Sequence, residues 1–274
     1  MTVSASELQL AALVVSYHTG PRLKECLYAL HSDPTVSEII LIDNGNPPQM
    51  QCWLDHWAGP EHRCRLIRPS KNLGFGRAVN LAAAQTAAHW LLVVNPDAVV
   101  KRGAADRLMK TATDFSEPSI VGGRIFDLHG REERGPRRRE LTLFRAITSA
   151  LGWNTWTLER TPPPTTAVTM PVISGAFFLT SAKSFAALGG FDERYFLHVE
   201  DVDLCARCWA AGGKVVYEPR AGALHYGATS NVSPRTVSAH KRDSLRLYFR
   251  SRARGPFHRA AIEIVLFGLR LVQR

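Results

Sequence analysis

The chain contains few of the features that mark a membrane-spanning, secreted or repetitive protein. No apolar run reaches the roughly 18 residues that a spanning helix needs, and Leu8–Tyr17 is too short for that purpose. No basic segment followed by a cleavage site opens the sequence, so we expect no signal peptide. Hydrophobic residues make up 45% of the 274 positions, which excludes a disordered chain. We expect a cytoplasmic protein, either free or peripheral on the inner face of the cytoplasmic membrane.

Cysteine is also scarce, with five residues in the whole chain. Cys205 and Cys208 form a single C-x-x-C, and no second pair follows at the spacing of a zinc ribbon. A closed structural zinc site needs four ligands. The spacing instead predicts two thiols near the buried face of a helix, and a reducing compartment fits best.

The positive charge is concentrated at one end of the sequence. The formal net charge is +10, and residues Arg235–Arg274 hold ten basic and two acidic side chains, which is +8. The preceding residues hold 24 basic and 22 acidic side chains, which leaves +2. A nucleic-acid-binding domain would spread its charge over the folded body, so we expect no nucleic-acid partner.

The first hundred residues alternate strand and helix patterns. This alternation predicts a parallel sheet with right-handed crossovers, in which ligands bind beyond the carboxyl ends of the strands. The predicted strands are Leu10–Tyr17, Glu38–Asp43, Arg65–Arg68 and Trp90–Val94, and the predicted helices are Pro21–His31, residues 51–58 and Gly76–His89. Three of these strands end in polar residues that should converge on one crevice: Ser16-Tyr17, Asp43-Asn44 and Asn95-Pro96-Asp97.

The second half has a different pattern. Residues 129–140 are polar and charged, which indicates either a solvated loop or a flap that contacts phosphate, and residues 161–166 form another loop. The predicted strands here are Ser119–Phe126, Val172–Thr180 and Lys214–Tyr217, and the predicted helices are Ser181–Leu188 and Glu200–Ala211.

Several polar residues admit both a structural and a chemical interpretation. Glu200 and Asp201 begin a helix, where the helix dipole favours acids, but a carboxylate at a cleft edge also serves as a general base. Asp97 follows a buried strand and could hold Mg²⁺ together with substrate phosphates. His225 is either a further ligand or a structural residue. Asp43 is either a turn residue or the acceptor of a pyrimidine N3–H.

Gly74 and Gly76 permit close approach of a ligand to the backbone before an Ala-rich helix. The third glycine of the dinucleotide-binding fingerprint is missing, and the motif does not follow the first strand. These features disfavour a nicotinamide-dependent dehydrogenase.

The order of these segments resembles the inverting family 2 glycosyltransferases of GT-A fold, in particular their rhamnosyltransferase-like branch. The resemblance spans residues 13 to 230 and is carried by LVVSYHTGPRLKECLYAL, IILIDNG, NLGFGRAVNLA, WLLVVNPDAVV, ISGAFFLTSAKSFAALGGFDERYFLHVEDVDLCARCWAAGG and ALHYGATS. It implies an α/β protein with a Rossmann-like, mostly parallel sheet flanked by helices. Residues 1–234 would form the catalytic domain, with a nucleotide-binding half (1–118) and an acceptor-binding half (119–234), and residues 235–274 a basic helical extension.

The resemblance also implies roles for individual residues. Asp97 would bind a divalent cation, Mg²⁺ or Mn²⁺, with His225 joining it. Asp201 would be the catalytic base, and Glu200 beside it would orient the acceptor. Asn95 stands where many relatives have Asp. The residues that would bind the nucleotide-sugar are Ser16, Tyr17, Asp43, Asn44, Asn72, Gly74 and Asn95.

The function implied is a single displacement with inversion at the sugar. The expected donor is dTDP-rhamnose, and the expected acceptor is a saccharide or a lipid-linked saccharide of cell-surface polysaccharide synthesis. Two alternatives remain: the same chemistry with a UDP-sugar donor, and a non-catalytic nucleotide-sugar-binding subunit of a polysaccharide assembly complex.

Arginine and apolar residues are interleaved from Ser244 onward, on either side of Pro256. Basic amphipathic helices are typical of membrane-surface elements. The alternative is that these helices pack on the catalytic domain, or on a second subunit in a homodimer.

Overall fold

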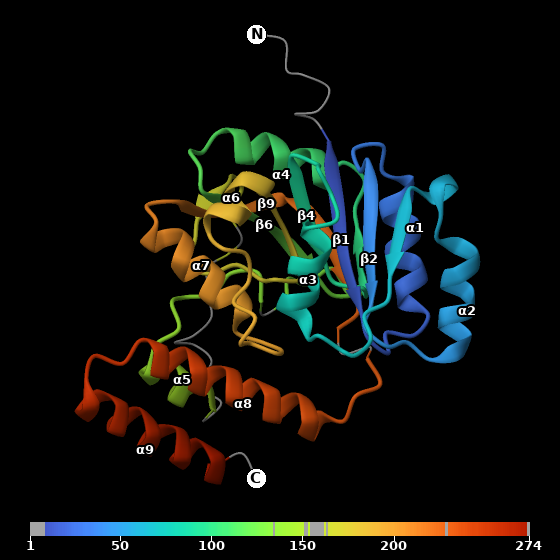
Figure 1. The fold of residues 1–274 in the computed structure, drawn as a ribbon. Coiled ribbons are helices and arrows are strands. Elements are labelled where there is room, and N and C mark those ends of the chain that lie inside the picture. Colours follow the sequence, from blue (N-terminus) through green and yellow to red (C-terminus); the bar gives the residue numbers. More distant parts are fainter. Residues whose placement is uncertain are drawn as a thin grey trace.

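The computed structural model describes residues 9–133, 135–150, 153, 162, 164–227 and 230–272. One twisted sheet runs through it, with helices on both faces (Figure 1). The strand order over the described residues is β3-β2-β1-β4-β8-β6-β9-β5, and β7 pairs with β9. The strands are β1 Leu10–Ser16, β2 Glu38–Asp43, β3 Cys64–Ile67, β4 Trp90–Val94, β5 Ala98–Val100, β6 Ser119–Phe126, β7 Val168–Thr169, β8 Phe177–Ser181 and β9 Lys214–His225.

The strands β3, β2, β1 and β4 are parallel neighbours, as the sequence predicts. Ser16 lies opposite Asp43, and Val14 lies opposite Val94. The three polar strand ends therefore do meet at one edge of the sheet. These strands are almost continuously apolar because helices cover them on both faces.

Antiparallel pairs join the second half to this parallel core. β8 runs antiparallel to β4 and β6, and the long β9 is parallel to β6 but antiparallel to β5. β8 begins only at Phe177, later than expected, since Val172 instead pairs with Arg138 in an isolated bridge. The loop predicted at residues 161–166 lies partly outside the described residues.

Two layers of helices bury the sheet. On one face, Leu27, Leu54 and Leu108 of α1, α2 and α4 share a core cluster. On the other face, α3, α6, α7 and α8 form the second cluster (Figure 1). The helices are α1 Arg22–Ser32, α2 Pro48–Trp57, α3 Phe75–Ala83, α4 Ala104–Thr113, α5 Leu143–Ala150, α6 Ala182–Ala187, α7 Glu200–Ala210, α8 Pro234–Ser251 and α9 Pro256–Val272, with a 3-10 turn at Pro60–His62. Cys205 and Cys208 are both buried on α7, as their spacing predicts.

The basic extension is two helices, of which α8 packs on the body. Tyr248 and Phe249 are buried, Ser244 Oγ donates to the Leu197 carbonyl (2.9 Å), and Arg252 pairs with Asp203 (2.9 Å). The second helix, α9, lies beside α8 and α5 (Figure 1). Within the described residues, no helix is both long enough and apolar enough to cross a membrane.

Candidate active site

The carboxyl ends of β1 and β2 carry Ser16 and Asp43, both buried. Asp43 Oδ1 accepts hydrogen bonds from the backbone N–H of Gly45 (3.1 Å) and Asn46 (2.8 Å) and from Asn46 Nδ2 (2.9 Å). Asp43 Oδ2 accepts from Arg68 Nε at 2.9 Å. Asn46 Nδ2 also donates to Ser16 Oγ (2.9 Å). Oδ1 thus has three donors and Oδ2 has one, and because the Asp43 side chain is fully buried, a base could reach it only if a neighbouring group moved.

A second loop follows β3 and is hydrogen-bonded to the residue that follows β2. Asn44 Nδ2 donates to the Gly74 carbonyl (3.1 Å), and Asn44 Oδ1 accepts from the Leu73 N–H (3.1 Å). Asn72 Oδ1 accepts from the Gly74 N–H (2.9 Å). Gly74 has φ +78°, and a Cβ there would lie 2.3 Å from the Phe196 carbonyl oxygen. Asn44, Asn72 and Gly74 therefore shape this loop, and Gly74 is required by its backbone conformation.

Tyr17 is the half-buried residue that follows β1. Its ring lies against Gly45, where a Cβ would be 3.3 Å from Tyr17 Cε2. The His18 ring meets it edge-on, with centroids 4.6 Å apart. A half-buried aromatic ring beside the Ser16 and Asp43 strand ends is suited to stacking on a nucleobase.

Asp97 and His225 form the second group at this edge. They are neighbours because β5 pairs antiparallel with β9, which places Ala98 opposite His225. His225 Nε2 lies 3.1 Å from Asp97 Oδ1 and 3.3 Å from Asn95 Nδ2, and His225 Nδ1 lies 3.0 Å from Glu133 Oε2. Burial alone would lower the pKa of His225, but Asp97 and then Glu133 outweigh it and raise that pKa to about 9. The imidazole is therefore protonated at neutral pH.

The donor set of Asp97 and His225 is compatible with a divalent cation. A carboxylate and an imidazole are both metal ligands, and a cation must displace the imidazole proton to use the second. Within the described residues, no three His, Cys, Asp or Glu side chains converge as a metal cluster. Asp97 and His225 would therefore supply two ligands at most, which suits a cation that takes its remaining ligands from water and phosphate oxygens.

Asp201 lies at the start of α7. Its Oδ2 accepts from the Gly175 N–H (2.9 Å) and from Arg138 Nη2. Burial would raise the pKa of Asp201, but the Arg138 charge and the Gly175 N–H lower it below the usual value. The preceding Val199 has φ +73°, a conformation that β-branched residues rarely adopt, and such outliers concentrate at functional sites. An ionised carboxylate, 14% exposed, is thus held at the helix start.

Glu200 differs from its neighbour. It is 6% exposed, and its Oε2 has no hydrogen-bond partner within the described residues. Burial, and then the negative charge of Asp201, raise its pKa well above the usual range. The two adjacent carboxyl groups therefore hold different protonation states, with Asp201 ionised and Glu200 protonated.

The segment between β6 and α5 contributes two residues that the sequence analysis missed. Glu133 contacts His225, and Arg138 contacts Asp201. The segment is anchored by a buried Arg137–Glu132 ion pair (2.6 Å), and Tyr217 Oη donates to Glu132 (2.5 Å). The solvated-loop interpretation of residues 129–140 is therefore wrong for Glu132, Glu133, Arg137 and Arg138. Charge alternation in the sequence was the available signal, but it did not indicate which partners the charges would meet.

Comparison with known proteins identifies the family. The family model for glycosyl transferase family 2 matches residues 12–189. The chain is 32% identical over 243 residues to the N-acetylglucosaminyl-diphospho-decaprenol L-rhamnosyltransferase of Mycobacterium tuberculosis, covering 81% of this chain and 77% of that protein. It is 25% identical over 232 residues to the rhamnosyltransferase WbbL of Escherichia coli, covering 81% of this chain and 84% of that one.

Solved structures share the fold. The crystal structure of GalNAc-T7 with UDP, GalNAc and Mn²⁺ superposes with a TM-score of 0.64 at 14% identity, over 89% of this chain and 48% of that one. TarS 1–349 of S. aureus in complex with UDP-GlcNAc gives a TM-score of 0.58 at 13% identity, over 95% and 71% of the two chains. This chain spans about half the length of the GalNAc-T7 chain.

The fold, with polar residues at the carboxyl edge of its parallel strands, is the GT-A fold of the glycosyltransferases. This chain belongs to glycosyltransferase family 2, and its relatives include rhamnosyltransferases.

Proposed function

We propose that this enzyme is an inverting rhamnosyltransferase that moves rhamnose from dTDP-rhamnose to a lipid-linked saccharide. The observation that carries the proposal is Asp201, an ionised carboxylate held at a helix start by Arg138 and Gly175. The relative from M. tuberculosis, by its name, transfers L-rhamnose to N-acetylglucosaminyl-diphospho-decaprenol. That name supports both the sugar and the lipid-diphosphate acceptor proposed for this chain.

The proposed chemistry is a single displacement. Asp201 takes the proton of the acceptor hydroxyl, and the hydroxyl oxygen forms a bond to the anomeric carbon. The bond from that carbon to the diphosphate breaks on the opposite face, and its electron pair leaves with the nucleoside diphosphate. Asp97 and His225 would hold a divalent cation, which when bound offsets the charge that develops on the diphosphate. Glu200, protonated, would donate a hydrogen bond that orients the acceptor.

Ser16, Tyr17 and Asp43 would form the base pocket. Tyr17 would stack on the pyrimidine, while Asp43 would accept its N3–H in exchange for one of its present donors. The loop held by Asn44, Asn72 and Gly74 would close one side of the pocket, and Asn95 would lie beside the diphosphate.

Product analysis tests this proposal directly. The enzyme would be incubated with dTDP-rhamnose and polyprenyl-diphospho-N-acetylglucosamine, with Mg²⁺ or Mn²⁺, and the lipid product separated by chromatography. We expect rhamnosylated lipid of inverted anomeric configuration. The same assay with UDP-N-acetylglucosamine tests the alternative donor, which solved neighbours containing UDP favour. Binding of either donor with no transfer and no donor hydrolysis would support the non-catalytic alternative instead.

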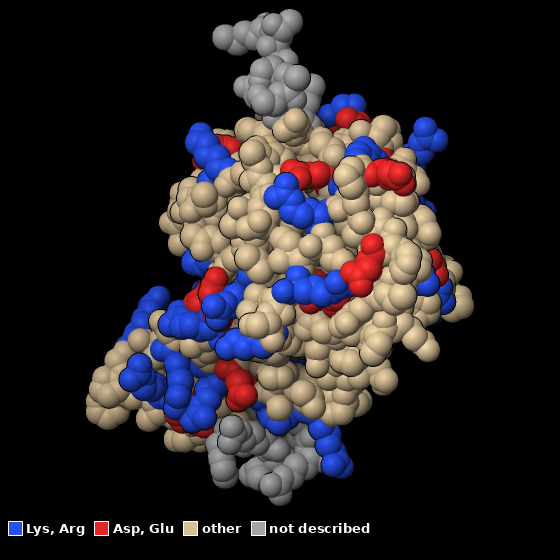
Figure 2. All heavy atoms as spheres, turned by 45° about the vertical axis from the view of Figure 1, so that its right-hand side comes forward, with Lys and Arg blue, Asp and Glu red and all other residues tan. Residues whose placement is uncertain are grey.

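We also propose that α9, together with Trp153, rests on the inner face of the cytoplasmic membrane, where a lipid-linked acceptor is available. Large apolar side chains are exposed there: Phe257 by 91%, Ile264 by 73% and Trp153 by 62%. Figure 2 shows Lys and Arg side chains gathered over the lower part of the molecule, where α8 and α9 lie. Cationic side chains close to anionic lipid each stabilise binding by about 1 kcal/mol.

Vesicle co-sedimentation tests the membrane contact. The double variant Phe257→Asp with Ile264→Asp should pellet less with anionic vesicles than the native chain. Leu128→Asp is the matched control, because Leu128 is 67% exposed and lies outside the extension. Equal pelleting of all three proteins, together with a loss of dimer in the double variant, would mean that this face binds a second copy of the chain.

A further inference from the structure

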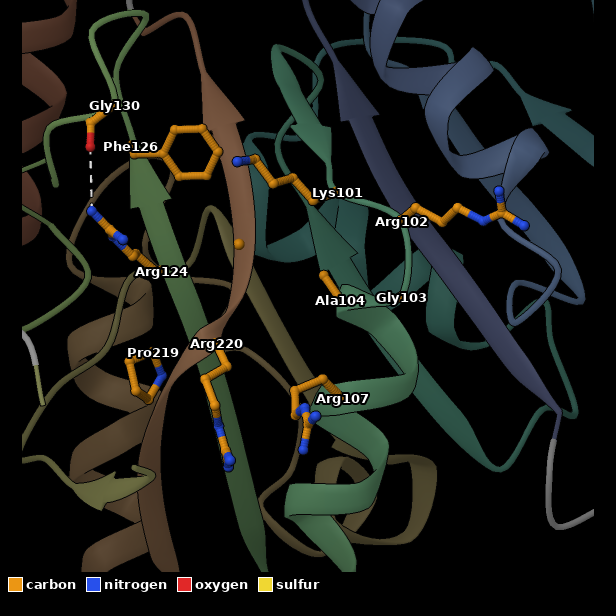
Figure 3. A pocket seen from close by; sticks show the side chains of 11 residues that line it. Lys101, Arg102, Gly103, Ala104, Arg107, Arg124, Phe126, Gly130, Pro219 and Arg220 are labelled. Atoms are coloured by element: carbon orange, nitrogen blue, oxygen red, sulfur yellow. Dashed lines mark hydrogen bonds between the residues drawn. The ribbon is translucent and has the colours of Figure 1, made fainter. Parts of the chain in front are cut away.

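A second cavity, separate from the polar edge of the parallel strands, lies between the start of α4 and the strands β6 and β9 (Figure 3). Its volume is about 390 Å³. Among the described residues that line it, none is acidic and five are cationic. The lining residues used below are Lys101, Arg107, Arg124 and Arg220, and this space is called the basic cavity. Arg102 points away from it in Figure 3 and is left out of the argument.

Three of these four cations have no carboxylate partner within the described residues. Arg220 is neutralised by Glu218 (2.9 Å). Lys101 Nζ lies 4.3 Å from the centre of the Phe126 ring, and Figure 3 shows it directed toward that ring. Arg124 Nη2 donates to the Gly130 carbonyl (3.2 Å). These two contacts orient the cations but leave their charges uncompensated.

Arg124 carries a further unused donor. Its Nε is buried and has no hydrogen-bond partner in the described part of the chain. A buried donor without a partner is unfavourable, and a guanidinium N–H is a strong donor toward anions. A small movement of the Arg124 side chain, which lines the cavity, would bring this N–H to an acceptor oxygen.

The backbone at the start of α4 adds to the positive potential. Gly103 precedes the helix with φ +76° and has no side chain that could cap it. The first N–H groups of a helix lack intrahelical partners, and with the helix dipole they favour an anion. Asp106, the acid of the first turn, is engaged by Lys110 at 2.8 Å.

We propose that the basic cavity binds a phosphate group. Three cations without a carboxylate partner and the start of α4 border one space, and a phosphate suits both. Liquid water occupies about 30 Å³ per molecule, so a cavity of about 390 Å³ has room for a diphosphate and several waters. The phosphate comes either from a free diphosphate or from an anionic lipid headgroup. This site does not depend on the proposed sugar transfer.

The basic cavity is distinct from the place expected for the donor diphosphate. That diphosphate would lie beside Asp97, which precedes β5, whereas Lys101 follows β5 and bonds through its N–H to the Gly222 carbonyl (3.0 Å). The two positions are at opposite ends of the same short strand. The strand β5 also pairs with β9 at His225, which is the proposed cation ligand. An anion in the basic cavity would therefore contact the strand that carries this ligand.

Calorimetric titration with inorganic pyrophosphate tests the site. Full-length protein is used, with EDTA to remove the cation that binding beside Asp97 would need. We expect one binding event, weakened at least about fivefold in Arg107→Ala and in Arg124→Ala, as expected for lost hydrogen bonds to a charged group. Arg107→Lys should retain part of the affinity.

The matched control is Arg65→Ala, which removes an exposed arginine from β3, at the opposite edge of the sheet. A second arm replaces pyrophosphate with vesicles that contain phosphatidylglycerol. Pyrophosphate binding that depends on Arg107 and Arg124 identifies a free phosphate ligand, and vesicle binding with the same dependence identifies a lipid headgroup. If Arg65→Ala weakens both kinds of binding as much as the cavity variants do, or if no variant matters, the proposal is wrong. Melting temperatures without ligand verify that each variant folds.

Discussion

Arg138 caps Asp201. The same guanidinium nitrogen, Nη2, donates to Asp201 Oδ2 and to the carbonyl oxygen of Ile173 (2.8 Å), which fixes the guanidinium between the two. This contact keeps Asp201 ionised, but it also occupies one of the two oxygens that would take a proton. The other carboxylate oxygen, Asp201 Oδ1, accepts a hydrogen bond from the N–H of Val202 (2.8 Å). Arg138 therefore controls both the charge and the availability of the proposed base.

Replacing Arg138 should change the pH dependence of the reaction. Because Arg138 lowers the pKa of Asp201, Arg138→Met should raise that pKa. The acidic limb of the kcat profile then moves to higher pH, since the base must be ionised to act. Rates measured from pH 5 to 9 test this shift. Arg131→Met, in the same segment but paired with Asp127, should leave the profile in place.

Asp201→Asn should remove catalysis while preserving donor binding. General-base catalysis typically contributes about 10²- to 10⁴-fold to a rate, and asparagine keeps the size of the side chain without its basicity. Steady-state rates would be measured beside calorimetry with the nucleotide-sugar. If affinity for the donor falls as far as the rate does, Asp201 has a binding role and the base assignment fails.

Asp97→Ala should make nucleotide binding independent of added cation. In the native chain, Mg²⁺ or Mn²⁺ should strengthen binding of the nucleoside diphosphate, because Asp97 and His225 would hold a cation that offsets the charge of the phosphate groups. Calorimetry with and without EDTA measures this difference. An unchanged cation effect in the variant would exclude Asp97 as a ligand. Glu61→Gln is a suitable control, since Glu61 is an exposed residue of the 3-10 turn before β3.

Glu200→Gln should stabilise the fold increasingly as pH rises. Glu200 has a raised pKa in the folded state, so the native chain loses stability once pH exceeds the unfolded pKa, near 4.5. The loss is at most about 1.4 kcal/mol per pH unit until the folded pKa is reached. Glutamine is neutral at every pH, so the variant does not lose this stability as pH rises. The difference in melting temperature between variant and native chain should therefore be larger at pH 8 than at pH 5.

The matched control for that experiment is Glu193→Gln, because Glu193 is 51% exposed. It should shift the melting temperature equally at both pH values. A constant difference for Glu200→Gln as well would mean that Glu200 is ionised in the folded enzyme and cannot donate the proposed hydrogen bond.

Much of the polar edge of the parallel strands was predictable because it follows from local patterns. Short β-branched runs that end in polar residues predict strand ends, and parallel pairing brings those ends together. This is how Ser16, Asp43 and Asn95 were expected at one edge, and the register of β1 with β2 and β4 agrees. The antiparallel insertion of β8 between β4 and β6 was not predicted, since nothing in a strand's own residues specifies its neighbours.

The sequence alone determined the residue types available for chemistry: a carboxylate after β4, an acidic pair at a helix start and a basic extension. The tertiary structure determined the protonation states of these residues. Glu200 and Asp201 are adjacent, yet one is protonated and the other ionised, because only Asp201 meets Arg138 and Gly175. Those partners, like Glu133 for His225, are distant in the chain. A pKa depends on burial and neighbouring charge, and both exist only once the chain has folded.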